Sequence, residues 1–174
     1  MQKLRALIIG VGAPTASSAK GGGHQIGYTH ASVMMRHPQV DLVGAADISQ
    51  ENLSAFLSVF PEARGFTAYR QALSELKPDL VSICTYVGLH REMVEAGVKH
   101  SVTGILCEKP FVNSPKDLGE IEGLLQQSNA RLVVAHIRRF LPAYQKAKAL
   151  IDEGAIGRLQ VASVGFDGWD LSEM

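Results

Sequence analysis

The sequence predicts an α/β fold with a doubly wound parallel sheet. Apolar runs of strand length alternate with longer helical segments through about residue 138. Repetition of strand, helix and strand gives a parallel sheet with right-handed crossovers. In addition, the first apolar run leads into Gly10-Val11-Gly12, and acidic or basic residues directly follow two later runs. We therefore expect a Rossmann-like sheet with a ligand crevice along its carboxyl edge.

The strands are predicted from short apolar runs that contain few charges. Leu4–Gly10 has Arg5 as its only charged residue, as expected for a strand buried on both faces. Pro61 and Pro78 mark turns between later elements. The other predicted strands are Val40–Ala46, a short stretch near Gly65, Leu80–Cys84, Thr103–Cys107 and Arg131–Ala135. The predicted helices are Tyr28–Met35, Gln50–Val59, Tyr69–Leu76, Leu89–Lys99 and Pro115–Gln127.

Composition excludes several classes of protein. The chain has 174 residues, of which 46% are hydrophobic, and it balances 17 basic against 17 acidic groups. This is the composition of an ordinary globular protein. The even charge argues against a nucleic-acid partner, which normally requires a basic stripe. No apolar run approaches the roughly 18 residues of a membrane span. The N-terminus also lacks a signal-peptide pattern, so we expect a cytoplasmic protein without a membrane partner.

The cysteines and histidines give no sign of a metal site. Cys84 and Cys107 lie in or at the end of predicted core strands, without Cys-x-x-Cys spacing, so we expect buried, inert thiols. The six histidines are scattered along the chain without the spacing of metal ligands. We therefore expect no metal.

The glycines after the first strand predict a dinucleotide site. Gly10 and Gly12 fit the usual fingerprint, but Thr15 stands where the third glycine is expected. If residues 13–22 are an insertion of about ten residues, Gly27 restores the third glycine at the start of a helical segment. Gly10, Gly12 and Gly27 are therefore the predicted cofactor-binding glycines.

The predicted insertion, residues 13–22, has the composition of a flexible loop. We expect it to lie over the ligand and to become ordered by nucleotide, with Lys20 as a phosphate contact. A loop that projects into solvent without a role is an equally open interpretation.

Asp47 ends the second predicted strand. An acid at this position accepts hydrogen bonds from the hydroxyls of an adenosine ribose. Removing an insertion of about ten residues brings its distance from Gly12 near the roughly 20 residues expected. A carboxylate here repels a 2′-phosphate, and Ile48-Ser49-Gln50 supplies no arginine, so NAD is favoured over NADP. Capping of the helix that starts near Gln50 is the alternative role.

Glu108-Lys109-Pro110 directly follows a predicted strand. A lysine at the carboxyl end of a parallel strand faces the ligand crevice, where its amine can transfer a proton. Pro110 biases Lys109 away from helical backbone angles and so holds the lysine at the edge of the sheet. An ordinary solvated strand terminus is the alternative.

Thr85 and His90 follow the strand that ends at Cys84. They lie on the same predicted edge as Gly10 and Lys109, so the hydroxyl and the imidazole are candidates to face a cofactor. Capping of the helix predicted from Leu89 is the alternative for both side chains.

These motifs together resemble a known family. The features in order are the strand with Gly10-Val11-Gly12, Asp47, Cys84-Thr85 with His90, Glu108-Lys109-Pro110, Arg138–Pro142 and Gly154–Gly157. They are similar to the signatures of the glucose-fructose oxidoreductase and inositol dehydrogenase family, often called Gfo/Idh/MocA. The resemblance covers residues 4 to about 165. Glu-Lys-Pro is its most specific motif, and the glycine fingerprint is the one from which this chain departs.

The resemblance implies an NAD-dependent oxidoreductase that acts on the CH-OH group of a sugar, an inositol or a related polyol. Lys109 would assist proton transfer while hydride passes to nicotinamide. Glu108, Thr85 and His90 would line the nicotinamide side. A homo-oligomer is expected at full length. The candidate substrate contacts are Arg138, Arg139 and Trp169, with solvation or helix capping as the alternative for the two arginines.

The resemblance also implies a second domain that this chain only begins. We expect a Rossmann domain over 1–138, then a linker helix and the first strand of an incomplete α+β substrate domain over 139–174. Leu159–Phe166 is the predicted strand, and one strand cannot form a sheet. The chain is therefore expected to be a fragment, a truncated gene product or one half of an assembly.

Three other functions fit parts of the sequence. A nucleotide-binding module without turnover would bind NAD and oxidise no polyol. An NAD-dependent lyase or glycosidase of the same family would use transient oxidation, with Lys109 assisting elimination. A methyltransferase on the same sheet is disfavoured, because Lys109-Pro110 has no role in it.

Overall fold

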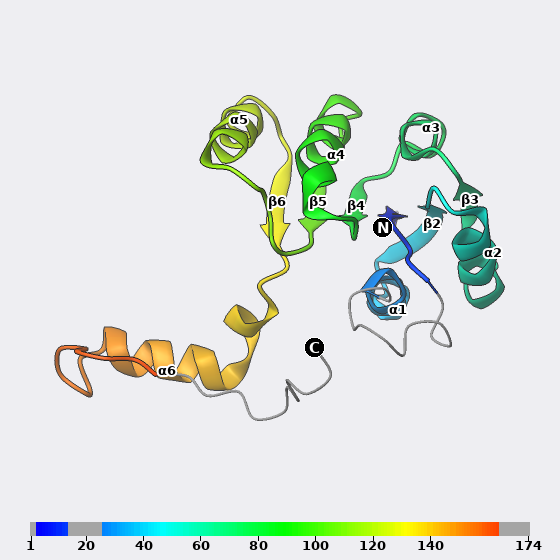
Figure 1. Cartoon of the computed structure of the whole chain (residues 1–174). Coiled ribbons are helices and arrows are strands. Elements are labelled where there is room, and N and C mark those ends of the chain that lie inside the picture. Colours follow the sequence, from blue (N-terminus) through cyan, green and yellow to red (C-terminus); the bar gives the residue numbers. More distant parts are fainter. Residues whose placement is uncertain (1–2, 14–25, 164–174) are drawn as a thin grey trace, which may run out of the picture. The chain divides into compact units, whose positions relative to one another are not determined.

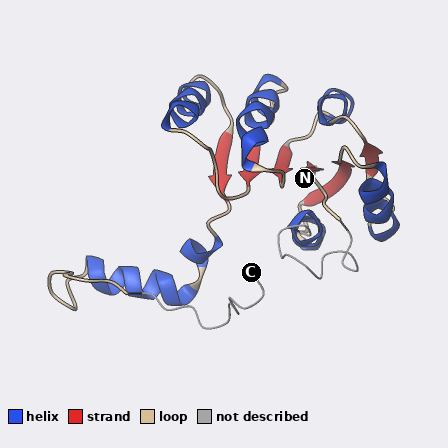
Figure 2. Cartoon of the chain, in the orientation of Figure 1, coloured by secondary structure: helices blue, strands red, loops and turns tan. Residues whose placement is uncertain are grey.

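Strands and helices alternate along the first part of the chain (Figure 1; Figure 2). The computed structural model describes residues 3–13 and 26–163. The strands are β1 (Leu4–Ile9), β2 (Val40–Ala46), β3 (Arg64–Phe66), β4 (Leu80–Ile83), β5 (Gly104–Cys107) and β6 (Arg131–Val134). The helices are α1 (Ile26–Arg36), α2 (Gln50–Val59), α3 (Tyr69–Leu76), α4 (Val87–Lys99), α5 (Pro115–Gln126), the 3-10 helix η1 (Ile137–Phe140) and α6 (Pro142–Asp152).

The six strands form one sheet in the order β3-β2-β1-β4-β5-β6. Every neighbouring pair is parallel. The predicted doubly wound parallel sheet is therefore confirmed. The chain adds strands outward from β1 to β3 and then returns to place β4 on the other side of β1. This reversal creates a crevice at the carboxyl ends of β1 and β4, where such sheets bind ligands.

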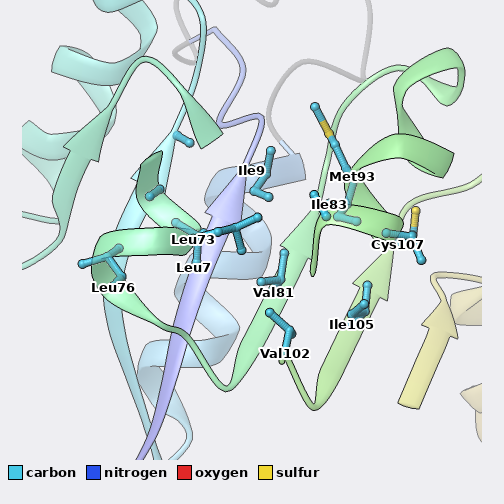
Figure 3. Close-up of a cluster of buried hydrophobic side chains, with 14 of the residues drawn as sticks. Leu7, Ile9, Leu73, Leu76, Val81, Ile83, Met93, Val102, Ile105 and Cys107 are labelled. Atoms are coloured by element: carbon cyan, nitrogen blue, oxygen red, sulfur yellow. The ribbon is translucent and has the colours of Figure 1, made fainter. Parts of the chain in front are cut away.

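Helices cover the sheet because alternate strand residues point to opposite faces. In β1, Leu7 and Ile9 join a core with Leu73 of α3 and Met93 of α4. Figure 3 shows these side chains gathered on one face of the sheet. Ile8 points the other way and packs with residues of α1 and α2. Each face of the sheet therefore has its own apolar core, and β1 contributes to both.

The predicted bounds of several elements agree with the structure, because local signals fix their ends. Ser49 caps α2, since its side chain accepts a hydrogen bond from the Asn52 backbone N–H. Ser114 caps α5 in the same way, and Pro115 occupies the first turn. The bounds predicted for Gln50–Val59 and Tyr69–Leu76 agree with α2 and α3.

The chain divides into two compact units, Met1–Ala135 and His136–Met174. The second unit contains η1 and α6, and α6 has no buried residue. Leu159 to Ser163 form no strand, contrary to the expectation for 159–166. These residues pair with no other strand among the described residues, and a strand needs such a partner for its backbone hydrogen bonds. Residues 164–166 lie outside the described residues.

No helix in the described ranges, 3–13 and 26–163, is long and apolar enough to cross a membrane.

Candidate functional site

A glycine turn leaves the carboxyl end of β1. Gly10 and Gly12 have φ angles of 84° and 75°, in the left-handed region that favours glycine. A Cβ on Gly10 would lie 2.7 Å from the Thr85 methyl and 3.0 Å from the Cys84 carbonyl group. The backbone therefore passes closer to the end of β4 than any side chain at residue 10 would allow.

Gly27 packs the start of α1 against this turn. A Cβ on Gly27 would lie 2.8 Å from the carbonyl oxygens of Gly10 and Val11 and from the Val11 Cα. No ordinary Cβ tolerates backbone atoms at that distance, so only glycine allows the helix to start here. Gly27 therefore lies where the third glycine of the fingerprint was predicted. Of the predicted insertion, residues 13–22, all but Ala13 lie outside the described residues, including Lys20.

Asp47 follows β2 and holds the glycine turn. Its Oδ2 accepts a hydrogen bond from the Gly12 backbone N–H at 3.1 Å, and its Oδ1 accepts one from the Ser49 N–H at 2.9 Å. Ser49, and not Asp47, is the N-cap of α2. Each carboxylate oxygen can accept a further hydrogen bond, so Asp47 retains acceptor capacity for ribose hydroxyls.

The glycine turn and Asp47 fit a dinucleotide. Gly10 and Gly12 carry no side chain, and α1 starts so close to the turn that residue 27 has no room for a Cβ. The approach of a pyrophosphate to the turn and to a helix N-terminus requires such open backbone. Ile48 is 94% exposed beside Asp47, so it offers an apolar surface and no positive charge. These residues would hold the adenosine and pyrophosphate parts of NAD.

Lys109 lies at the carboxyl end of β5. Its side chain is exposed, whereas Glu108 and Cys107 before it are buried. The peptide bond between Lys109 and Pro110 is cis. The strands β1, β4 and β5 are consecutive in the sheet and parallel, so Lys109 shares its edge with the glycine turn and Thr85.

Glu108 turns inward and contacts a histidine that the sequence pattern did not single out. Its Oε1 lies 3.2 Å from Nε2 of His30 on α1, and the two side chains are only 11% and 10% exposed. Both Glu108 carboxylate oxygens thus have partners within the protein, and the place of Glu108 on the nicotinamide side stays a prediction. A helical pattern could have identified His30, since it lies beside the buried residues Gly27 and Ala31 on one face of α1.

His30 also contacts β4 through its other ring nitrogen. Its Nδ1 lies 2.6 Å from Oγ of Ser82 and 3.4 Å from Sγ of Cys84. Burial lowers the pKa of His30 below its ordinary value of 6.5, and the Glu108 carboxylate opposes that shift only in part. The imidazole is therefore neutral near pH 7.

Cys84 and Cys107 lie at the ends of β4 and β5, and Cys84 is only partly buried, contrary to the prediction that both are buried. Burial raises the pKa of Cys84 to about 12, and it raises that of Cys107 to about 12 as well. Both residues are free cysteines, and Cys107 is fully buried. The described residues contain no group of three or more histidine, cysteine or acidic side chains that could hold a metal ion.

His90 supports the loop from inside the protein. Its side chain is 0% exposed, and its Nε2 and Nδ1 lie 2.9 Å and 3.0 Å from the carbonyl oxygens of Thr85 and Phe111. The ring is buried in contact with these two carbonyl oxygens, and its place beside the cofactor stays a prediction. The Thr85 hydroxyl donates to Sδ of Met93 at 3.3 Å. Neither side chain caps α4, whose N-cap is Tyr86.

The predicted substrate contacts belong to the second unit. Arg138 and Arg139 lie in η1, and Trp169 lies outside the described residues. The Leu141 backbone N–H donates to the Arg138 carbonyl at 3.2 Å. The roles of these residues stay predictions.

The larger surface groove lies away from the site. Its volume is about 600 Å³, and it is lined at the amino ends of β1 and β2 by residues such as Lys3, Val40 and Asp41. Two of its charged side chains, Lys3 and Asp41, form an ion pair at 2.7 Å. A smaller groove of about 180 Å³ lies beside the start of α4 and is lined by Val87, Gly88 and Asn113.

The glycine turn, Asp47 and the switch in strand order define a dinucleotide-binding Rossmann domain. The model of a family described as "Oxidoreductase family, NAD-binding Rossmann fold" matches residues 4–136. The chain therefore belongs to this family, Gfo/Idh/MocA, as the motifs predicted.

Two relatives have names that refer to a polyol or to a sugar derivative. The chain is 26% identical to inositol 2-dehydrogenase of Rhizobium meliloti over 144 residues, which cover 82% of this chain and 42% of that protein. It is 29% identical to 2,7-anhydro-N-acetylneuraminate hydratase of Mediterraneibacter gnavus over 92 residues, which cover 53% of this chain and 24% of that protein.

A solved structure shares the fold. Scyllo-inositol dehydrogenase from Lactobacillus casei, with bound NAD(H) and scyllo-inositol, superposes with a TM-score of 0.77 at 20% identity. The superposition covers 90% of this chain and 43% of that chain. The present chain thus spans less than half the length of these three proteins.

Proposed function

We propose that this chain is the nucleotide-binding part of an NAD-dependent oxidoreductase that acts on a secondary hydroxyl of a sugar, an inositol or a related polyol. The observation that carries the proposal is that one sheet edge bears the glycine turn, Asp47 and the exposed Lys109. Membership of the oxidoreductase family supports the same reaction class.

The glycine turn and Asp47 bind the nucleotide in this proposal. The glycine turn leaves room for the pyrophosphate at the start of α1, where the helix N-terminus favours negative charge. Asp47 accepts hydrogen bonds from the ribose hydroxyls. NADP is disfavoured because its 2′-phosphate would meet the Asp47 carboxylate beside the uncharged, exposed Ile48.

Lys109 performs the proton transfer in this proposal. NAD, when bound, supplies the acceptor for the hydride that leaves the substrate carbon. The hydroxyl on that carbon must lose its proton as the carbonyl forms, and the Lys109 Nζ is the group that takes it. The Glu108 carboxylate accepts a hydrogen bond from the Lys109 N–H, and His90 contacts the Phe111 carbonyl two residues later.

A lyase or hydratase that uses transient oxidation is the second candidate. The Mediterraneibacter gnavus relative, a hydratase by name, favours it. In that reaction Lys109 would remove a proton next to the transient carbonyl, so that a leaving group departs. Reduced nicotinamide would not accumulate, which separates this candidate from the dehydrogenase.

The test measures nicotinamide reduction with a panel of inositols and sugars, in the longest chain that the gene encodes. Lys109→Met should retain NAD affinity and slow turnover by about 10² to 10⁴, the usual contribution of proton transfer. Lys116→Met is the matched control, because Lys116 is exposed on α5. Full activity of Lys109→Met would remove Lys109 from the mechanism. NAD binding without reduction or elimination in any substrate mixture would favour a binding module.

A further inference from the structure

A buried polar cluster links α1, β4 and the residue before Lys109. His30 provides the centre, with Ser82 at 2.6 Å from its Nδ1 and Glu108 at 3.2 Å from its Nε2. Ser82 is completely buried, and Glu108 is 9% exposed. Polar groups at this depth stabilise a fold only when all of them have partners, so the cluster specifies the arrangement of the three segments.

The partners of the neutral His30 ring decide which of its two nitrogens carries the hydrogen. Glu108 accepts hydrogen bonds as a carboxylate, so the Nε2 of His30 carries the hydrogen that it donates. The Nδ1 of the neutral ring is then an acceptor, and the Ser82 hydroxyl donates to it. The cluster is therefore a directed chain in which Ser82 donates to His30 and His30 donates to Glu108.

The chain of hydrogen bonds ends at the backbone of Lys109. The second carboxylate oxygen of Glu108 accepts a hydrogen bond from the Lys109 N–H at 3.1 Å. The Glu108 N–H donates to the Ile83 carbonyl at 2.9 Å, which fixes the backbone one residue earlier. Glu108 is thus held through both its backbone and its side chain, and its side chain in turn holds Lys109.

The order serine, histidine, carboxylate resembles the catalytic triad of a hydrolase, but it cannot act as one here. The Ser82 side chain is 0% exposed in the middle of the sheet, so no substrate can reach its Oγ. A nucleophile needs an open path to the reacting atom. The cluster therefore acts on Lys109 and not on a substrate of its own.

We infer that His30 is a positioning residue for Lys109, which it acts on through the Glu108 carboxylate. The inference rests on the proposed role of Lys109 as the proton-transfer group. Without the Nε2–H donor, Glu108 would be a buried carboxylate with one oxygen unpaired, and it would turn toward water. The Lys109 N–H would then lose its acceptor, and the backbone of Lys109 would no longer be fixed at the edge of the sheet.

The titratable groups that face His30 belong to two other segments. They are Glu108 after β5 and Cys84 after β4. The pKa of Cys84 is about 12, so the thiol stays neutral in the ordinary pH range. Protonation of His30 therefore changes the His30–Glu108 contact, and through it the hydrogen bond of Lys109.

The test is a pH titration of the 174-residue chain by ¹H–¹⁵N NMR. The Lys109 amide resonance should move with the same midpoint as the His30 ring, below the ordinary value of 6.5. In His30→Gln the movement should disappear, because the amide group of glutamine does not titrate. The matched control is His37→Gln, an exposed histidine just after α1, which should leave the movement unchanged.

Hydrogen exchange at neutral pH gives a second readout. His30→Gln keeps an N–H donor near the Nε2 position, so exchange at Lys109 should stay within about twofold of the parent chain. His30→Leu removes the donor, and exchange at Lys109 should rise by about tenfold or more. If His30→Leu does not fold, the titration of the unaltered chain and of His30→Gln still decides the matter.

A Lys109 amide resonance that does not move as His30 ionises would overturn the inference. So would a movement that persists unchanged in His30→Gln. Either result leaves the proposed function intact if NAD still binds in the same sample. Absence of NAD binding with an intact link between His30 and Lys109 would instead overturn the proposed function alone.

Discussion

Helices α4 and α6 have similar lengths, 13 and 11 residues, but they differ in what they bury. α4 buries Met93, Val94 and Ala96, among others, in the first unit. α6 buries none of its residues, and its apolar Leu141 cap, Tyr144 and Ile151 stay exposed. Amphipathic helices gain most of their stability from packing, so the core of the first unit stabilises α4, whereas the described part of the second unit provides no such core for α6.

The same comparison applies to function. Every group that the proposed nucleotide site requires lies between Gly10 and Lys109, within the first unit. The predicted substrate contacts Arg138, Arg139 and Trp169 belong to the second unit. In the proposed function, the first unit therefore supplies the cofactor site and Lys109, whereas the predicted substrate contacts lie outside it.

The largest predicted effect compares one phenylalanine from each unit. Phe56 is completely buried, with ring centroids 5.0 Å from Tyr28 and 4.6 Å from Phe60. Phe56→Ala should lower the free energy of unfolding by about 3–5 kcal/mol through lost burial and a cavity. Phe140 is 61% exposed in η1, so Phe140→Ala should change it by about 0.5 kcal/mol or less. Urea unfolding measures both, and equal losses would contradict the difference between the units.

A smaller effect is expected at Asp47. Asp47→Ser removes a charged acceptor from the ribose hydroxyls, which should weaken NAD by about 1.5–3 kcal/mol and relatively improve NADP. Asp41→Ser is the matched control, because Asp41 is exposed at the other end of the same strand, beside Lys3. Titrations with both nucleotides measure the change. Equal weakening of NAD and NADP would rule out the ribose contact.

The smallest effect is a dependence of stability on pH. The pKa of His30 is lowered in the folded chain, so the unfolded chain binds protons more readily as the pH falls through 6.5. The contribution of His30 is therefore complete above this value and is lost as the pH falls toward the pKa of the folded state. His30→Gln should flatten this part of the curve relative to His37→Gln. Urea midpoints across the acid range measure it, and identical curves for the two variants would refute the assignment.

Local patterns predicted the sheet and where several candidate site residues lie in it, because those features depend on neighbouring residues. The strand before Gly10, the cap at Ser49 and the acid after β2 each follow from a few adjacent positions. Gly27 was located despite the interrupted fingerprint, since a glycine at the start of a helix marks close packing.

Three features escaped prediction because they depend on residues distant in the sequence. The contact of His30 with Ser82 and Glu108 forms only when the sheet brings α1, β4 and β5 together. The inward direction of Glu108 and His90 likewise depends on tertiary partners, whereas their positions after strands suggested a ligand. The strand expected from Leu159 failed, as far as Ser163, because an apolar pattern forms no strand without a neighbour.

The most direct test of the central claim is an NAD titration of the 174-residue chain, followed by the backbone amide resonances. We predict that shifts concentrate at the carboxyl edge of the sheet, at Gly10, Gly12, Asp47, Thr85 and Lys109. The amides lining the groove at the amino ends of β1 and β2 should stay unchanged. Shifts confined to that groove, or no shifts at saturating NAD, would contradict the assignment of the carboxyl edge as the nucleotide site.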